Sequence, residues 1–170
     1  MTPAAPKPFA EPIPLGRARA IPWVSVMAAS ALATAPVVAV LPLMPPPGLL
    51  MLLAWRLLAR YAIRPWAAAP LGFWDDLVSG QPLGSAVLLW SLVFLAIEAV
   101  EQRMVFRDFR VDWLIAAAAI AFCLIAGRLI AVRIDAPLWP LLSVQIIATI
   151  LAFPFAARVV AWIDRKRGIA

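Results

Sequence analysis

The chain has 170 residues, of which 65% are hydrophobic and 14% are charged. A soluble domain has about 45–50% apolar residues and too little interior to bury such an excess, so this composition predicts an integral membrane protein. The net charge of +6 would indicate a nucleic-acid partner in a soluble chain, but here the basic residues flank apolar runs, so no nucleic-acid partner is expected.

The first 21 residues contain five prolines and few large apolar side chains. Because proline fixes φ and removes a backbone donor, residues 1–21 are expected to form a disordered, proline-rich cytoplasmic tail. The first helix is expected over residues 22–43. A cleaved signal peptide is the alternative, since residues 33–35 (Ala-Thr-Ala) resemble a small-residue cleavage site. Pro36 would follow that cut and block the peptidase, which favours a retained helix.

Proline-rich breaks divide the rest of the chain into five further apolar segments. They predict helices over residues 48–63, 65–78, 83–100, 113–132 and 138–163, so that residues 22–163 form a six-helix transmembrane domain. Residues 164–170 form a basic cytoplasmic tail. The second and third helices are shorter than the roughly 20 residues that span a bilayer, so they are expected to be recessed or tilted. A re-entrant pair is the alternative for these two.

The basic residues predict the orientation. Six crossings place both termini on one side, and most arginines and lysines lie in the two tails or in the connections after the second and fourth helices. Only Arg128 and Arg133 fall on the opposite side, so both termini are expected to be cytoplasmic. Tryptophans near the predicted helix ends agree with this topology, because an amphipathic indole prefers the membrane interface.

Four ionisable residues are predicted inside or near the membrane: Arg56, Asp75, Asp76 and Glu98. Each costs about 3 kcal/mol or more at the membrane centre unless it is paired. Asp75 and Asp76 resemble the dyad of intramembrane aspartyl proteases, but neighbours on one helix point about 100° apart and cannot share a proton across a substrate. A proton or cation relay is a further alternative. A structural ion pair or a partner contact is the favoured interpretation.

The expected depths of these charges suggest a specific pair. Counted from Arg64 at the inner surface, Arg56 and Asp75 lie about 12 and 16 Å deep on consecutive helices. The sequence therefore predicts that Arg56 pairs with Asp75 or Asp76.

Two further polar groups have ordinary structural interpretations. Glu98 and Glu101 are expected to form a solvated helix end that pairs locally, while Gln145 and Thr149 are expected to hydrogen-bond between helices. The chain has no histidine and one cysteine, Cys123, which excludes imidazole metal sites, histidine catalysis and internal disulfides. It also has no phosphate-binding glycine loop or nucleophile motif. The sequence therefore predicts neither an enzyme nor a cofactor.

One 13-residue segment, GFWDDLVSGQPLG at residues 72–84, resembles the family of the rod-shape-determining protein MreD. In that family a glycine–aspartate stretch closes the third helix, and a small-residue turn, Pro-Leu-Gly and an apolar helix follow. The matching positions here include Asp75, Asp76, Gly80, Pro82 and Gly84. The resemblance extends to the short second helix after a proline-rich turn, the chain length, the cytoplasmic termini and the basic C-terminal tail.

The resemblance implies a non-enzymatic subunit of the bacterial cell-elongation machinery, which controls cell shape and peptidoglycan synthesis at the cytoplasmic (inner) membrane. Its direct partner would be the bitopic protein MreC. Through MreC it would act with the actin-like MreB, the glycosyltransferase RodA and a penicillin-binding transpeptidase. The six helices also resemble those of the substrate-binding components of vitamin transporters. A small-molecule-binding transport subunit is therefore the alternative function.

The six-span topology is testable by cysteine-accessibility labelling of intact cells. Single cysteines near Arg64, Arg107 and Lys166 should react only from the cytoplasm, and those at Gln81 and Asp135 should react from the periplasm. Labelling of position 81 from the cytoplasm alone would contradict the six-span topology.

Overall fold

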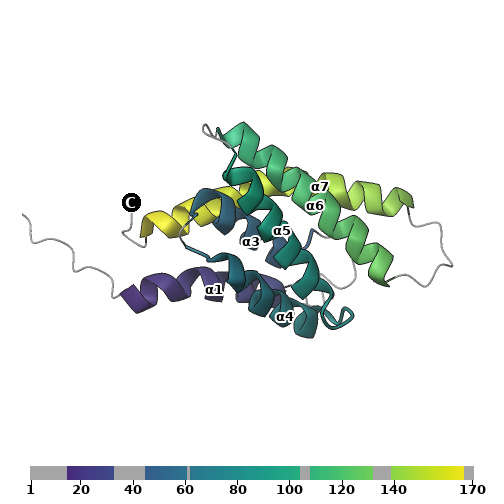
Figure 1. Cartoon of the computed structure of the whole chain (residues 1–170), viewed down its shortest axis with the longest axis horizontal. Coiled ribbons are helices and arrows are strands. Elements are labelled where there is room, and N and C mark those ends of the chain that lie inside the picture. Colours follow the sequence, from purple (N-terminus) through teal and green to yellow (C-terminus); the bar gives the residue numbers. More distant parts are fainter. Residues whose placement is uncertain (1–14, 33–44, 61, 104–107, 132–138, 167–170) are drawn as a thin grey trace, which may run out of the picture.

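The computed structural model describes residues 15–32, 45–60, 62–103, 108–131 and 139–166, and the regular structure of these residues is entirely helical (Figure 1). The α-helices are α1 (Leu15–Leu32), α3 (Pro47–Leu58), α4 (Ala68–Ser79), α5 (Ser85–Glu101), α6 (Phe109–Ala131) and α7 (Trp139–Lys166). A 3₁₀ turn, η1 (Pro65–Ala67), leads into α4. The prediction of an all-α chain is confirmed.

The helices differ from the expected segments mainly at their ends. The first begins at Leu15 rather than Pro22, inside the stretch expected to be a tail. Residues 1–14 and 33–44, which include the rest of the expected first helix and the alternative cleavage site, lie outside the described residues. The last helix continues through Asp164 to Lys166, so the expected C-terminal tail begins as helix.

The second helix is shorter than predicted. It begins at Pro47, where the missing N–H removes a donor that would have no partner in the first turn. It ends at Leu58 rather than at residue 63, and the backbone at Ala59 leaves the helical region with φ −123° and ψ 73°. This earlier end changes which charges lie near one another.

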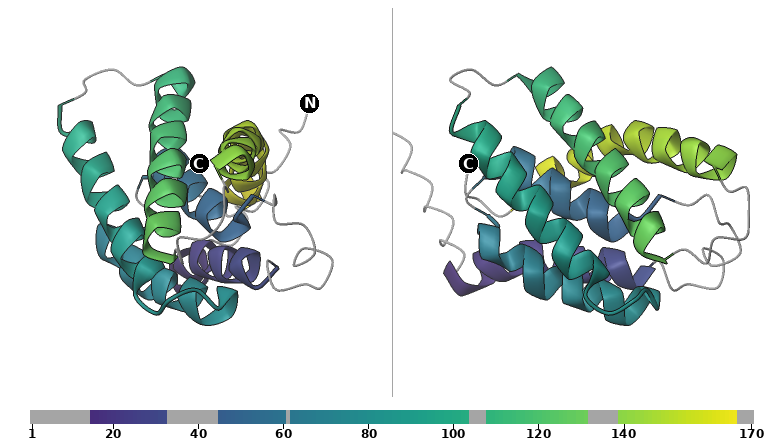
Figure 2. Two further views of the ribbon diagram at one scale, coloured as in Figure 1. Left: turned by 90° about the vertical axis from the view of Figure 1, so that its right-hand side faces the viewer. Right: turned by 45° about the vertical axis from the view of Figure 1, so that its right-hand side comes forward.

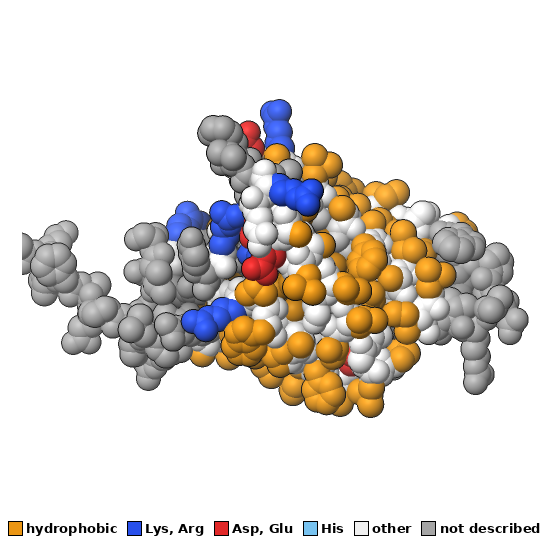
Figure 3. Space-filling view, in the orientation of Figure 1, with side chains coloured by type: hydrophobic (Ala, Val, Ile, Leu, Met, Phe, Trp, Pro, Cys, Tyr) orange, Lys and Arg blue, Asp and Glu red, His pale blue; other side chains and the backbone are white. Residues whose placement is uncertain are grey.

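In the part of the chain that the structure describes, two helices are long and apolar enough to cross a membrane, Phe109–Ile130 within α6 and Pro140–Lys166 within α7. In the most apolar 18-residue stretch of each helix, only 22% and 28%, respectively, is buried inside the molecule. The core helix of a soluble protein would be mostly buried, and a signal sequence would lie near the N-terminus. Large hydrophobic side chains such as Leu129, Leu151 and Phe155 are exposed, and hydrophobic side chains cover much of the visible surface (Figure 3). The fold is compatible with a helical membrane protein.

Helix α3 lies in the middle of the bundle, between α1 and α7 (Figure 2). Its apolar residues Leu52, Leu53 and Trp55 are completely buried. The Trp55 indole Nε1–H donates to Ser25 Oγ of α1 at 2.8 Å. Helices α4 and α5 pack on each other as a hairpin, with α4 also touching α1 and α5 also touching α6.

The bundle has two chemically different ends. One, here called the basic end, holds the last turns of α3, α5 and α7 and the first turn of α6. The other, here called the hairpin end, holds the α4–α5 turn, the first turn of α3 and the last turn of α6. In Figure 3 the Lys and Arg side chains on the visible face gather towards the end at which α7 terminates, the basic end. The distribution agrees with the charge asymmetry predicted from sequence.

Glycines allow the close approach of α4 and α5. A Cβ on Gly72 would lie 2.8 Å from the backbone of Ala86 and from the backbone nitrogen of Val87, too close for any side chain. At the turn, Gly80 ends α4 with φ +68° and Gly84 precedes α5 with φ +94°. Both values lie in the left-handed region that favours glycine. The segment 72–84 therefore needs glycine for two different physical reasons.

The Gly72 contact predicts a specific loss of stability. Gly72→Ala should lower the free energy of unfolding by about 1–3 kcal/mol, because overpacking forces the backbones of α4 and α5 apart. Thermal unfolding of the purified protein in detergent measures the change. Gly127→Ala on α6 is the matched control, since its Cβ would meet only Leu89 Cδ1 at an ordinary 3.6 Å. Equal stabilities of the two variants would contradict the proposed contact.

Candidate functional site

Asp76 caps the first turn of α5 from the neighbouring helix α4. Its carboxylate accepts hydrogen bonds from the backbone N–H groups of Gly84 and Ala86 and from the Ser85 hydroxyl, each at 2.9 Å. The first N–H groups of a helix lack partners within the helix and carry its positive partial charge, so a carboxylate stabilises them. With its side chain 1% exposed, Asp76 has a complete structural explanation.

Asp75 points in a different direction and lies against the first turn of α3. If Gly48 carried a Cβ atom, that atom would lie 2.8 Å from Asp75 Oδ1 and would also clash with the Ser30 hydroxyl of α1. Asp75, Ser30 and Gly48 are therefore close neighbours. Gly48 is the second residue of α3, so this carboxylate also lies near the positive end of a helix dipole. Asp76 therefore lies at the start of α5, whereas Asp75 lies at the start of α3. This agrees with the prediction that the two neighbouring side chains point in different directions.

Arg56 pairs with Glu101, so the predicted pairing of Arg56 with Asp75 or Asp76 is wrong. The Arg56 Nη2 atom lies 2.9 Å from Glu101 Oε2, and Nη1 lies 3.4 Å from Oε1. The two side chains are 5% and 10% exposed. Arg60 Nε reaches the same carboxylate at 3.4 Å, and the Arg56 guanidinium lies 5.7 Å from the centre of the Phe94 ring.

The early end of α3 explains the error. Because α3 stops at Leu58, Arg56 is in its last turn at the basic end rather than within a helix that continues to residue 63. Asp76 caps the start of α5, whereas Glu101 is its last residue. These two ends are about 24 Å apart at 1.5 Å per residue. The signal that could have identified Glu101 is topological, because the ends of the second and fourth helices lie on the same side of a six-helix chain.

Glu101 and Thr149 also differ from their predicted pairing. Glu101 is not part of a solvated helix end, since its carboxylate is largely buried between Arg56 and Arg60; the nearby Glu98 is half-buried on α5. Thr149 Oγ1 donates to the backbone oxygen of Gln145 at 2.6 Å. That bond is within α7 rather than between helices, so the hydroxyl satisfies itself locally.

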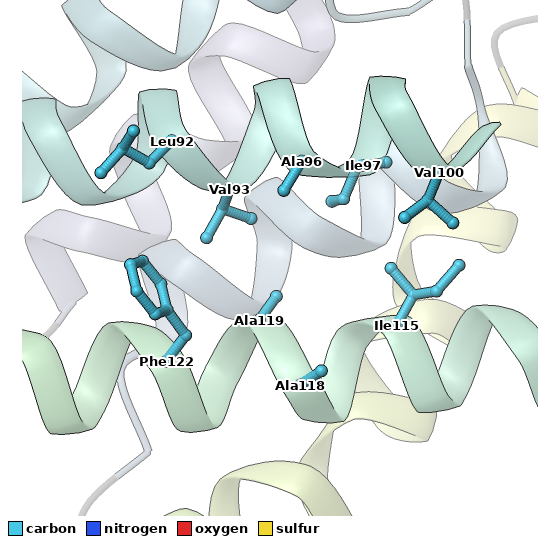
Figure 4. Close-up of a pocket in the computed structure, with 9 residues that line it drawn as sticks. All are labelled: Leu92, Val93, Ala96, Ile97, Val100, Ile115, Ala118, Ala119 and Phe122. Atoms are coloured by element: carbon cyan, nitrogen blue, oxygen red, sulfur yellow. The ribbon is translucent and has the colours of Figure 1, made fainter. Parts of the chain in front are cut away.

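An apolar groove runs between α5 and α6. It has a volume of about 480 Å³ and opens onto the surface. The residues that line it are all apolar: Leu92, Val93, Ala96, Ile97 and Val100 of α5, and Ile115, Ala118, Ala119 and Phe122 of α6. Figure 4 shows these two rows facing each other, with alanines between larger side chains. Small residues of this kind allow another helix to approach closely in a membrane.

A second hollow, of about 320 Å³, lies at the hairpin end and differs in chemistry. Five helices contribute to it. Its polar lining consists of Asp75, Gln81, Arg128 and Gln145. Its apolar lining includes Leu49, Leu89, Trp90, Leu124 and Leu142. Here called the polar cavity, it combines one carboxylate, one guanidinium and two amides with an apolar wall, as small-molecule sites do.

The predicted site residues therefore fall into two groups. Asp75, Asp76, Gly80, Pro82 and Gly84 come together at the hairpin end, whereas Arg56 and Glu98 lie towards the basic end. The close contacts of Gly48 and Gly72 and the pairing of Glu101 with Arg56 were not predicted from the sequence. Within the described ranges, no group of three His, Cys, Asp or Glu residues could hold a metal ion.

Comparison with known proteins adds no family assignment. A scan against protein-family models finds no match, and searches of curated proteins and of solved structures find no similar chain.

The Arg56–Glu101 pair predicts strong coupling between the two side chains. Arg56→Ala should destabilise the protein by about 3–5 kcal/mol, because it removes the guanidinium that contacts both oxygens of the largely buried Glu101 carboxylate. The double change Arg56→Ala/Glu101→Gln should recover part of that loss. Thermal unfolding in detergent, as a double-mutant cycle, measures the coupling free energy. Additive losses would contradict the pairing, as would equal coupling of Arg56 to Asp75→Asn.

Proposed function

We propose that this chain is an MreD-like subunit of the bacterial cell-elongation complex. It would be a multi-pass protein of the inner membrane, with six spans and both termini in the cytoplasm. It would bind MreC and help to position the wall synthases without catalysing a reaction itself. MreB, RodA and a penicillin-binding transpeptidase would be reached indirectly.

The resemblance supports this proposal through segment 72–84, because its residues have interlocking structural functions. Gly72 lets two helices touch, Asp76 caps α5, and Gly80 and Gly84 take left-handed backbone conformations. If the resemblance over these 13 residues were due to chance, there would be no reason for the matching residues to form one turn together. The charge distribution supports the proposed orientation, since the basic end corresponds to the side predicted to be cytoplasmic.

The observation that carries the binding role is the apolar groove between α5 and α6. A lipid-facing helix pair normally interdigitates, yet these two helices leave about 480 Å³ unfilled between them. MreC is bitopic and so offers a single transmembrane helix. The alanines at positions 96, 118 and 119 would let that helix approach the backbones of α5 and α6. We therefore place the MreC transmembrane helix in this groove.

The polar cavity favours the second candidate function, a small-molecule-binding subunit of a vitamin-type transporter. Such a subunit needs a polar site between helices near one membrane surface, and the polar cavity has four polar residues at the hairpin end. Copurification separates the two candidates. An MreD-like subunit should copurify with MreC, whereas a transport subunit should copurify with an energising ATPase module.

The elongation role predicts a cell-shape defect. Depletion in a rod-shaped host should give rounded, widening cells with misplaced wall synthesis. A photo-crosslinking residue at Ala118, inside the groove, should capture MreC, whereas the same residue at the exposed Leu151 of α7 should not. Normal rods combined with lost uptake of one vitamin would instead support the transport role. Equal capture at both positions would contradict the groove as the MreC site.

A further inference from the structure

The polar cavity has charges of both signs within one hollow. Asp75 and Arg128 both line it, from α4 and α6 respectively. A simple anion would be attracted by Arg128 but repelled by Asp75, and a simple cation would meet the reverse. A zwitterion satisfies both groups at once, because its ammonium can pair with the carboxylate and its acidic group with the guanidinium.

The remaining lining indicates what else the ligand carries. The amides of Gln81 and Gln145 provide donors and acceptors, and Leu49, Leu89 and Leu142 form an apolar wall. Trp90 adds an aromatic surface, which also attracts an ammonium group. Gln81 and Arg128 are exposed and so belong to the opening, whereas Asp75 and Gln145 are half-buried and lie deeper. A ligand with both a polar head and a hydrocarbon part matches this gradient.

Asp75 is suited to this binding role because its structural environment leaves it at the cavity. The neighbouring Asp76 carboxylate is turned away to cap α5. Asp75 Oδ1 instead lies beside Gly48, and the flanking residues Pro46 and Leu49 line the cavity. The carboxylate therefore lies at the cavity wall next to the first turn of α3.

We propose that the polar cavity binds a zwitterionic amphiphile, specifically the phosphoethanolamine headgroup of a membrane phospholipid. Asp75 accepts hydrogen bonds from the ammonium, Arg128 donates to the phosphate, and the acyl chains follow the apolar wall into the bilayer. The hairpin end is the side that the sequence predicts to be periplasmic, so the lipid would come from the outer leaflet. This inference rests on the membrane location in the proposed function but not on the MreC partner.

Short-chain lipids provide a direct test on the purified full-length protein in detergent. Binding of dihexanoyl-phosphatidylethanolamine, measured by native mass spectrometry and by thermal shift, should be at least about tenfold tighter than binding of the phosphatidylcholine analogue. The quaternary ammonium of choline has no N–H to donate to Asp75, and a charge-assisted hydrogen bond accounts for a factor of about ten or more. The phosphatidylglycerol analogue, which lacks the ammonium, should bind weakly as well.

Variants identify the groups involved. Arg128→Gln and Asp75→Asn should each weaken binding of the ethanolamine lipid about tenfold or more. Arg110→Gln on the same helix and Asp108→Asn, both exposed at the basic end, are matched controls and should bind normally. Because Arg128 is exposed, its replacement should leave the lipid-free melting temperature unchanged, so this variant remains informative even if Asp75→Asn unfolds.

Two further results distinguish a lipid from a soluble ligand and test the site itself. Phosphoethanolamine itself, without acyl chains, should bind more weakly than the lipid; equal binding would support a zwitterion site but assign it to a soluble ligand. Equal affinities for the three lipids, or unchanged binding by Arg128→Gln, would overturn the proposal. Crosslinking of MreC at Ala118 is a separate readout, so failure of the lipid site and failure of the partner role are distinguishable.

Discussion

The capping of α5 by the Asp76 carboxylate is the interaction on which the hairpin end depends. Isolated in an apolar environment, neither the carboxylate nor the unpaired N–H groups of a helix start would be tolerated. Together they satisfy each other, with three backbone N–H groups and one hydroxyl directed at two oxygens. The contact fixes the turn between α4 and α5 and brings their backbones together at Gly72. It also turns Asp76 away from Asp75, which leaves Asp75 beside α3 at the wall of the polar cavity.

At the basic end, too, a buried charge has a partner of opposite sign. There the Glu101 carboxylate neutralises Arg56, and Arg60 adds a partly exposed second contact. The most deeply buried charges in the described part of the chain thus lie near helix ends rather than in the middle of an apolar segment. Charge placement near helix ends leaves long apolar faces on α5, α6 and α7, where large hydrophobic side chains such as Leu95, Leu129 and Leu151 are exposed.

Much of the fold could be predicted from the sequence because apolar runs and prolines are local signals. The break at Pro45–Pro47 correctly predicted the start of the second helix, and Arg64-Pro65 correctly separated the second helix from the third. The turn after the third helix was predicted within one residue at its start, but the next helix begins at Ser85 rather than at residue 83. The partner of Arg56 could not be predicted, because depth was counted on a helix expected to continue to residue 63. The cap by Asp76 was missed for a related reason, since it depends on how a turn folds back in three dimensions. The groove and the polar cavity depend on interhelical spacing, which no local pattern encodes.

The shortness of α3 has a consequence for biogenesis. Its 12 residues extend about 18 Å, well below the roughly 30 Å of hydrocarbon in a bilayer. It lies between α1, which is synthesised before it, and α7, which is synthesised after the four other α-helices of the described residues. During synthesis one flank of α3 therefore lacks its packing partner, with the Arg56 charge near its end, until α7 has been made. The packing around α3 is thus completed only by α7, and a ribosome that stops before α7 releases a chain in which α3 is still uncovered on that side.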